Sequence, residues 1–263
     1  MLTIDDLRLG YGDEPVLDQL SLDVPAGQFA SLVGPSGCGK SSVLRAVVGL
    51  HEPDSGQVAL GVDQRDVGFL FQDDALLPWR SVRHNVALPL LIRGQDKRDA
   101  HEQAEVWLER MGLRGLGGRF PQQLSGGQRK RVALAQTLAP APRLLLMDEP
   151  FASLDAIVRR RVTEDLLAWV ERDEITVVLV THDLEEAITL SDRVHLLSAG
   201  PRARIVGSYD VPLARPRDLV ATRTEPQFGR LLEHLWDDLA EVVDTSGPST
   251  APHDAPRSRS EAA

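Results

Sequence analysis

One segment, Gly34-Pro-Ser-Gly-Cys-Gly-Lys-Ser41, constrains the fold of this 263-residue chain more than any other. It follows a short apolar run, Phe29–Val33, and precedes a run of helix-forming residues, Ser42–Val48. A strand that turns through glycines directly into a helix is a unit of α/β folds, in which parallel strands alternate with helices. We therefore expect an α/β domain that carries this turn at one edge of its sheet.

The spacing Gly-x-x-x-x-Gly-Lys-Ser is that of a phosphate-binding P-loop. Its glycines allow several backbone N–H groups to point at phosphate oxygens, and the following helix adds the positive end of its dipole. Lys40 is expected to reach the β- and γ-phosphates of ATP, and the Ser41 hydroxyl to bind Mg²⁺. Cys38 is interpreted as a small side chain that contributes a backbone N–H, in preference to a reactive thiol. The residues expected to bind ATP are Gly34, Pro35, Ser36, Gly37, Cys38, Gly39, Lys40, Ser41 and Ser42.

Composition limits the kinds of protein that this chain can be. Apolar residues make up 42% of it, and no run approaches the roughly 20 apolar residues of a membrane-spanning helix. Asp5 and Asp6 stand where a signal peptide would be cationic and then apolar, so we expect no leader. The single cysteine excludes an internal disulfide and a zinc site made of several thiolates. The net charge of −10 argues against a nucleic-acid partner, which would call for a basic face.

Short apolar runs alternate with helical patterns along the chain. The expected core strands are Phe29–Val33, Val67–Phe71, Arg143–Met147, Ile175–Val180 and Val194–Leu197. Leu2–Leu9 and Val16–Val24 alternate apolar with polar residues, which predicts an antiparallel sheet beside the core. Helical spacing between about 76 and 140 predicts a helical subdomain inserted between two core strands. We expect one domain over residues 1–240, followed by a tail over 241–263 that is too polar to order itself.

Two carboxylates, Asp148 and Glu149, follow one of the apolar strands. The carboxyl ends of buried parallel strands face the crevice in which an α/β sheet binds nucleotide. We therefore expect Asp148 to hold Mg²⁺ and Glu149 to act as the general base that polarises the attacking water. Gln72 and His182 also follow predicted strands, so Gln72 could ligate Mg²⁺ and His182 could contact the γ-phosphate. Position alone favours no catalytic role for either residue, with His182 a turn residue before a helix that Asp183 and Glu186 cap.

Leu124-Ser-Gly-Gly-Gln128 completes a set of motifs that resembles the ABC ATPases. The P-loop, Gln72, the carboxylates after the apolar strand and His182 stand in the same order and at similar spacing, up to about Gly200. The resemblance implies a P-loop NTPase core with a RecA-like, mostly parallel sheet, an N-terminal antiparallel β subdomain and an inserted helical subdomain. It also implies that Gln72 and His182 act in catalysis beside Glu149, and that Mg²⁺ is held by Ser41, Gln72 and Asp148.

The same resemblance implies that the chain works as a pair. A helix that begins in the signature motif would meet, with its N-terminus, the γ-phosphate bound by a second copy. The residues assigned to this contact in trans are Ser125, Gly126, Gly127 and Gln128. Asp155, in Ala152-Ser-Leu-Asp155, resembles the loop that crosses the interface between the two copies. Tyr11 resembles the aromatic residue that stacks on adenine, although its own context, Gly10-Tyr11-Gly12, by itself favours a turn aromatic.

A narrower resemblance concerns the kind of transport. Phe71-Gln-Asp-Asp-Ala-Leu-Leu-Pro-Trp-Arg-Ser-Val82 and Met147-Asp-Glu-Pro-Phe-Ala-Ser-Leu-Asp155 are similar to the nitrate, sulfonate and taurine importer group. That group implies uptake of a small anionic solute with a solute-binding protein and a permease, which would hold the chain at the cytoplasmic face of the cell membrane. The apolar residues Leu76, Leu77 and Trp79 would then dock a helix of the permease. Alternatively, Leu76 and Trp79 fill the joint between the core and the helical subdomain.

Two other functions stay open from the sequence. An ABC exporter subunit is the closer alternative, and it requires only that the resemblance to the importer group be wrong. A non-transport ABC ATPase that acts on nucleic acid is the more distant alternative. The long coiled coil of the chromosome-organising type and the cysteine clusters of the zinc-bearing repair type are both missing from this sequence.

Overall fold

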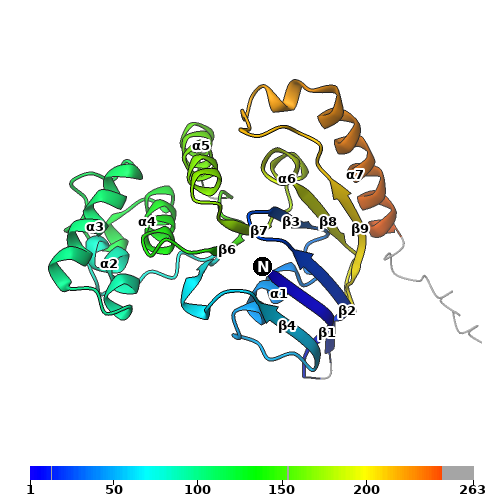
Figure 1. Ribbon diagram of the computed structural model, residues 1–263, viewed down its shortest axis with the longest axis horizontal. Coiled ribbons are helices and arrows are strands. Elements are labelled where there is room, and N and C mark those ends of the chain that lie inside the picture. The colour runs from blue at the N-terminus through cyan, green and yellow to red at the C-terminus, as the bar shows by residue number, and fades with distance from the viewer. Residues whose placement is uncertain (13, 153, 245–263) are drawn as a thin grey trace, which may run out of the picture.

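The computed structural model describes residues 1–12, 14–152 and 154–244, which form two sheets and the helices that cover them (Figure 1). The smaller sheet is antiparallel, with the strand order β2-β1-β4. Its strands are β1 (Leu2–Tyr11), β2 (Glu14–Val24) and β4 (Ser55–Leu60). The first two agree with the strands predicted from alternation. β4 is not among the predicted strands, because it has little apolar character and one of its residues is a glycine.

The larger sheet forms the core, with the strand order β5-β6-β7-β3-β8-β9. Its strands are β3 (Phe29–Val33), β5 (Val67–Leu70), β6 (Leu144–Asp148), β7 (Thr176–Val180), β8 (Arg193–Leu197) and β9 (Ile205–Asp210). All pairs in it are parallel except β8 with β9, which is antiparallel at one edge. This confirms the predicted α/β fold with a mostly parallel sheet. The edge strand β9 was not expected, because half of its residues are exposed and its apolar pattern is short.

Strand β6, between β5 and β7, shows why the core strands are continuously apolar. Leu144 and Leu146 belong to the cluster that includes α1 (Lys40–Val47) and the small sheet. Leu145 and Met147 belong to the cluster on the other face, with the helices that follow. Since side chains alternate between the faces of a strand, a strand buried on both faces needs apolar residues at every position. Helix α1 thus packs between the two sheets.

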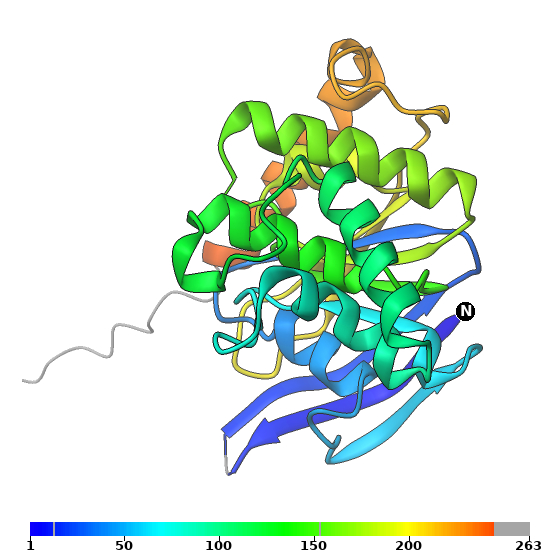
Figure 2. The ribbon, with the colours of Figure 1, turned by 90° about the vertical axis from the view of Figure 1, so that its left-hand side faces the viewer.

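The helical subdomain lies between β5 and β6 in the chain and stands to one side of the core in Figure 1; Figure 2 views it face on. It contains α2 (Val82–Ile92), α3 (Lys97–Arg110), the short 3-10 helix η2 (Pro121–Gln123) and α4 (Gly126–Leu138). Helix α4 begins at Gly126, within the signature motif, as the resemblance implies. Trp107 of α3 joins this subdomain to α5 (Ala156–Arg172) through an edge-on contact with Trp169, with ring centroids 5.0 Å apart.

The remaining elements complete the core. They are η1 (Gln64–Asp66), α6 (Leu184–Leu190), η3 (Thr222–Thr224) and α7 (Pro226–Asp244). Helix α7 includes residues 241–244, which the sequence assigned to the tail, because Leu235, Leu239 and Val242 continue its apolar side against β8 and α6. The rest of the predicted tail, 245–263, lies outside the described residues. Within the described part of the chain, every helix is too short or too polar to span a lipid bilayer.

Candidate active site

Three neighbouring strands bring the predicted site residues to one edge of the core sheet. In the parallel register, Asp148 of β6 lies opposite Val180 of β7, and Val180 lies opposite Leu32 of β3. The residues that follow these strands are therefore neighbours: Glu149 after β6, His182 after β7 and Gly34 after β3. The strand order β6-β7-β3 is a long-range feature, because β3 precedes β6 and β7 by more than 100 residues in the sequence.

The phosphate-binding loop wraps around the ammonium of Lys40. Its Nζ donates to the carbonyl oxygens of Gly34 and Pro35, at 2.8 Å in each case. Gly39 has a φ of 98°, and a Cβ there would lie 2.6 Å from Cγ1 of Val16. A side chain at Gly34 would lie 2.9 Å from the carbonyl oxygen of Leu197. Both positions therefore require glycine, and the loop fits closely between the small sheet and the core.

Ser41 and Asp148 form the part of the site that fits Mg²⁺. The Ser41 hydroxyl donates to Oδ1 of Asp148 at 2.9 Å, so two oxygen ligands of the kind that Mg²⁺ prefers are already adjacent. Asp148 is 2% exposed, and this burial raises the pKa of its carboxyl, while the hydrogen bond from Ser41 opposes the rise. Gln72, two residues beyond β5, is exposed at the same edge of the sheet, since β5 pairs with β6.

Glu149 and His182 meet across the end of the sheet. Nδ1 of His182 lies 3.1 Å from Oε1 of Glu149. Glu149 has a φ of 46°, a left-handed conformation that is uncommon for a residue with a side chain. Its backbone N–H still donates to the carbonyl oxygen of Val180, at 2.9 Å. The two side chains line a cavity of about 120 Å³, which has room for water beside the carboxylate.

Tyr11 lies beside the start of α1. Its hydroxyl is 3.4 Å from Oγ of Ser42, and this hydrogen bond lowers the pKa of the phenol. The ring of His51 meets the Tyr11 ring edge-on, with centroids 4.5 Å apart. With 48% of its surface exposed, the Tyr11 ring is held next to the phosphate-binding loop and keeps a face open to solvent.

The signature residues form a helix N-terminus. Oγ of Ser125 accepts from the backbone N–H of Gln128 at 3.3 Å, and the Gln128 side chain accepts from the backbone N–H of Ser125 at 3.0 Å. This capping box leaves Gly126 and Gly127 in the first turn of α4. Figure 1 shows α4 apart from α1, so one chain does not bring the signature motif to its own phosphate-binding loop.

The structure shows where Asp155 and the apolar loop of Leu76, Leu77 and Trp79 lie, which the sequence left undetermined. Asp155 caps α5, with Oδ1 accepting from the backbone N–H of Val158 at 3.0 Å.

Trp79 is 69% exposed and therefore does not fill the joint between the core and the helical subdomain. Leu76, in contrast, is partly buried against the core cluster, so the alternative interpretation holds for Leu76 and fails for Trp79.

One charged residue next to the site, Lys130 of α4, was not predicted. It is 1% exposed, and its Nζ donates to the backbone carbonyl oxygens of Phe71 at 2.8 Å and Gln72 at 2.9 Å. A lysine two residues after the signature motif, on a side of the helix that carries apolar residues, is the signal that could have singled it out.

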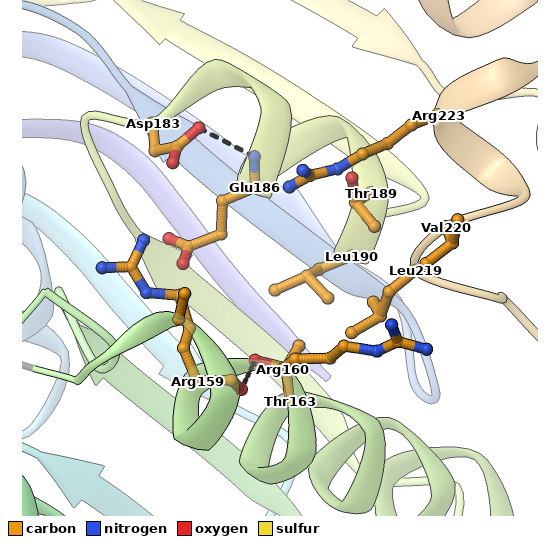
Figure 3. A pocket seen from close by; sticks show the side chains of 11 residues that line it. Arg159, Arg160, Thr163, Asp183, Glu186, Thr189, Leu190, Leu219, Val220 and Arg223 are labelled. Atoms are coloured by element: carbon orange, nitrogen blue, oxygen red, sulfur yellow. Dashed lines mark hydrogen bonds between the residues drawn. The ribbon is translucent and has the colours of Figure 1, made fainter.

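A larger cavity of about 300 Å³ adjoins the site between α5, α6 and the segment 219–223 (Figure 3). Arg159 and Glu186 line both this cavity and the smaller one beside Glu149. Burial raises the pKa of the Glu186 carboxyl. The other two arginines of the larger cavity are paired, Arg160 with Glu164 at 2.8 Å and Arg223 with Glu185 at 3.4 Å. The cavity therefore carries mixed charge.

Comparison with known proteins identifies the family. The family model described as ABC transporter matches residues 17–152. Over 86% of its length, the chain is 43% identical to the aliphatic sulfonates import ATP-binding protein SsuB 1 of Mesorhizobium japonicum, of which it covers 85%. It is 44% identical, over 96% of its length, to the sulfate/thiosulfate import ATP-binding protein CysA of Gloeobacter violaceus, of which it covers 76%.

A third relative is longer than this chain. The nitrate import ATP-binding protein NrtC of Synechococcus elongatus is 39% identical over 86% of the chain, which covers 35% of that protein. Among solved structures, the ATP-binding cassette MJ0796, determined as a dimer bound to ADP and Pi, matches with a TM-score of 0.74. It is 30% identical over 81% of this chain and 100% of that one. The chain has a P-loop and a Glu149–His182 pair, and it matches these relatives along most of its length. It therefore belongs to the ABC transporter family, as an ATP-hydrolysing ATP-binding cassette.

Proposed function

We propose that this chain is the ATP-hydrolysing subunit of an ABC importer that powers uptake of a small anionic solute through a separate permease. The observation that carries the proposal is the adjacency, at one sheet edge, of Lys40 in its loop, the Ser41–Asp148 pair and the Glu149–His182 pair. The names of relatives that import sulfonates, sulfate or nitrate support the direction of transport and the class of solute, with taurine as a further sulfonate.

In the proposed mechanism each side chain has a separate task. Lys40 and the backbone N–H groups of its loop bind and orient the phosphates of ATP. Mg²⁺, when bound, would neutralise phosphate charge, and Ser41, Asp148 and Gln72 are the residues that would hold it. Glu149 accepts a proton from the attacking water. His182 orients the Glu149 carboxylate through Nδ1, which leaves its Nε2 available for the γ-phosphate.

Two copies of the chain are needed for a complete site in this proposal. Ser125, Gly126, Gly127 and Gln128 present a helix N-terminus that lies apart from the loop of its own chain, which supports contact with ATP on a second copy. Asp155 would lie at the interface between the copies. The dimer of MJ0796 with ADP and Pi is a relative in which two cassettes associate.

The permease would bind at the apolar loop of Leu76, Leu77 and Trp79, where Trp79 exposes a large aromatic surface. Exposed aromatic residues are typical anchors of protein interfaces. The chain would thus be held at the cytoplasmic face of the cell membrane, and a solute-binding protein would deliver the anion to the opposite side of the permease. No contact with nucleic acid is part of the proposal.

Uptake measurements test the proposal directly. A strain without this chain should lose uptake of labelled taurine, an alkanesulfonate, sulfate or nitrate, and the wild-type chain should restore it. The Glu149→Gln chain, produced at the same level, should not. Unchanged uptake of all four anions in the strain without the chain would contradict the solute class, and accumulation of one of them inside such cells would instead indicate an exporter.

A further inference from the structure

Lys130 connects two motifs that are far apart in the sequence. Its ammonium is among the most buried charged groups of the described residues, and its two hydrogen bonds end on backbone oxygens of Phe71 and Gln72. Lys130 itself lies in the second turn of α4, two residues after Gln128. A single side chain therefore joins the helix of the signature motif to the residue proposed to ligate Mg²⁺.

A second contact reinforces the connection. Arg129 pairs with Asp74, with Nε 3.2 Å from Oδ2, and its Nη1 donates to the carbonyl oxygen of Leu124 at 2.9 Å. The segment 71–74 is thus attached at two points to the first turns of α4. Because Gln72 is exposed and sits beyond the end of β5, these attachments determine where its backbone lies.

The burial of Lys130 has a high energetic penalty that apolar packing would avoid. Removing an ammonium from water is unfavourable unless hydrogen bonds and opposite charges compensate for it. Burial lowers the pKa of Lys130, while Asp74, Asp148, Asp73 and Glu149 act in the opposite direction. The compensating charges thus include Asp148 and Glu149, the two carboxylates of the active site. The Lys130 ammonium and these carboxylates therefore interact electrostatically.

We propose that Lys130 is a positioning residue that couples the signature helix to Gln72, an inference that rests on the proposed function. When the N-terminus of α4 binds ATP on a second copy, α4 moves as a rigid body. Through its hydrogen bonds, Lys130 moves the backbone of Gln72 together with α4. Each chain would then place its own Mg²⁺ ligand only when its signature motif is engaged, so that the two sites of the pair become competent together.

The experiment compares Lys130→Met, which keeps the apolar stem and removes the donor, with Lys130→Gln, which keeps a donor. The full-length chain is used, and ATP hydrolysis is measured against Mg²⁺ concentration.

Removal of a residue that orients a metal ligand typically changes metal affinity or activity ~10–100-fold. Lys130→Met should therefore lower kcat by about 10-fold or more and raise the Mg²⁺ concentration for half-maximal activity. ATP binding without Mg²⁺ should stay unchanged, and Lys130→Gln should recover part of the loss. Lys97→Met, at an exposed lysine of α3, is the matched control and should behave as wild type.

A double-mutant cycle with Gln72→Ala separates positioning from a purely structural role. Because Lys130 acts through Gln72, the double variant Gln72→Ala/Lys130→Met should hydrolyse ATP no more slowly than Gln72→Ala alone. Losses that multiply, or an unchanged Mg²⁺ dependence in Lys130→Met, would overturn the coupling. Should Lys130→Met fail to fold, Lys130→Gln carries the same cycle. Absence of ATP hydrolysis in the wild-type chain would overturn the proposed function and the coupling with it, whereas multiplying losses in an active protein overturn the coupling alone.

Discussion

Glu149, the proposed general base, is held in place by its backbone as well as by His182. Its left-handed conformation is the kind of local strain that folded proteins keep where a side chain must point in one direction. Removal of a general base typically lowers the rate ~10²–10⁴-fold. Glu149→Gln should cause a loss of this size while it retains ATP binding, because an amide occupies the same volume and cannot accept the proton.

The measurement is steady-state phosphate release together with size-exclusion chromatography in ATP. The variant should accumulate as an ATP-bound dimer, since binding continues and hydrolysis does not. Glu164→Gln, on the exposed side of α5, serves as control. Turnover of Glu149→Gln within a few-fold of the wild type would show that another group accepts the proton.

Asp148 places a buried charge where the fold favours a neutral group. Burial raises the pKa of this carboxyl, so the ionised form destabilises the folded protein. At low pH the carboxyl is neutral in both folded and unfolded chains and the destabilisation is absent. It develops as the pH rises from the ordinary pKa of the unfolded chain to the raised pKa of the folded state, and it is fully present above that pKa.

Asp148→Asn should therefore raise the melting temperature at neutral pH in the absence of Mg²⁺, and this gain should shrink as the pH falls. Hydrolysis should be nearly lost, because the variant gives up the charge of the proposed Mg²⁺ ligand. Thermal unfolding at a series of pH values checks the first expectation. A gain that is equal at all pH values would mean that removal of the charge is not its cause.

Two serines begin helices of the helical subdomain with the same geometry, and only one is expected to have a second role. Ser81 caps α2 and Ser125 caps α4, each accepting from a backbone N–H at 3.3 Å. Loss of such a cap typically destabilises by ~0.5–2 kcal/mol. A hydroxyl can also donate while it accepts, so Ser125 can cap its helix and bind a phosphate at once.

Ser81→Ala and Ser125→Ala should thus lower the free energy of unfolding by similar amounts, about 1 kcal/mol. Only Ser125→Ala should in addition lower ATP hydrolysis by ~10-fold or more, the effect of losing one hydrogen bond to a charged group. Urea unfolding and phosphate release on the same preparations give both quantities. Equal activity of the two variants would confine Ser125 to capping.

The molecule as a whole presents Trp79 beside the link between its two subdomains. Substitutions of exposed residues usually change stability by less than ~0.5 kcal/mol, so Trp79→Ala should leave the free energy of unfolding almost unchanged. Truncation of an interface anchor typically weakens binding by ≥ ~2 kcal/mol, so the variant should no longer co-purify with the permease from detergent-solubilised membranes. Val106→Ala, at an exposed apolar residue of α3, is the control. Co-purification at the wild-type level would place the permease contact elsewhere.

The contiguous motifs determined much of this protein from the sequence alone. The turn at Gly34–Ser41 requires a strand before it and a helix after it, and the strand that ends at Asp148 is apolar throughout because both its faces are buried. Such patterns are local, since backbone conformation and side-chain alternation act over a few residues. For the same reason the sequence did not predict β4 and β9. These strands are held by pairing with β1 and β8, and their own residues show little preference for a strand.

The tertiary structure alone decided which segments meet. The strand order places Glu149 against His182, and the packing of α4 on the segment after β5 joins Lys130 to Gln72. The exposure of Trp79 and the burial of Leu76, three residues apart, likewise depend on which surface the helical subdomain covers. These contacts link residues far apart in the chain. Their free energy comes from desolvation and pairing in the assembled fold, and no local pattern in the sequence encodes it.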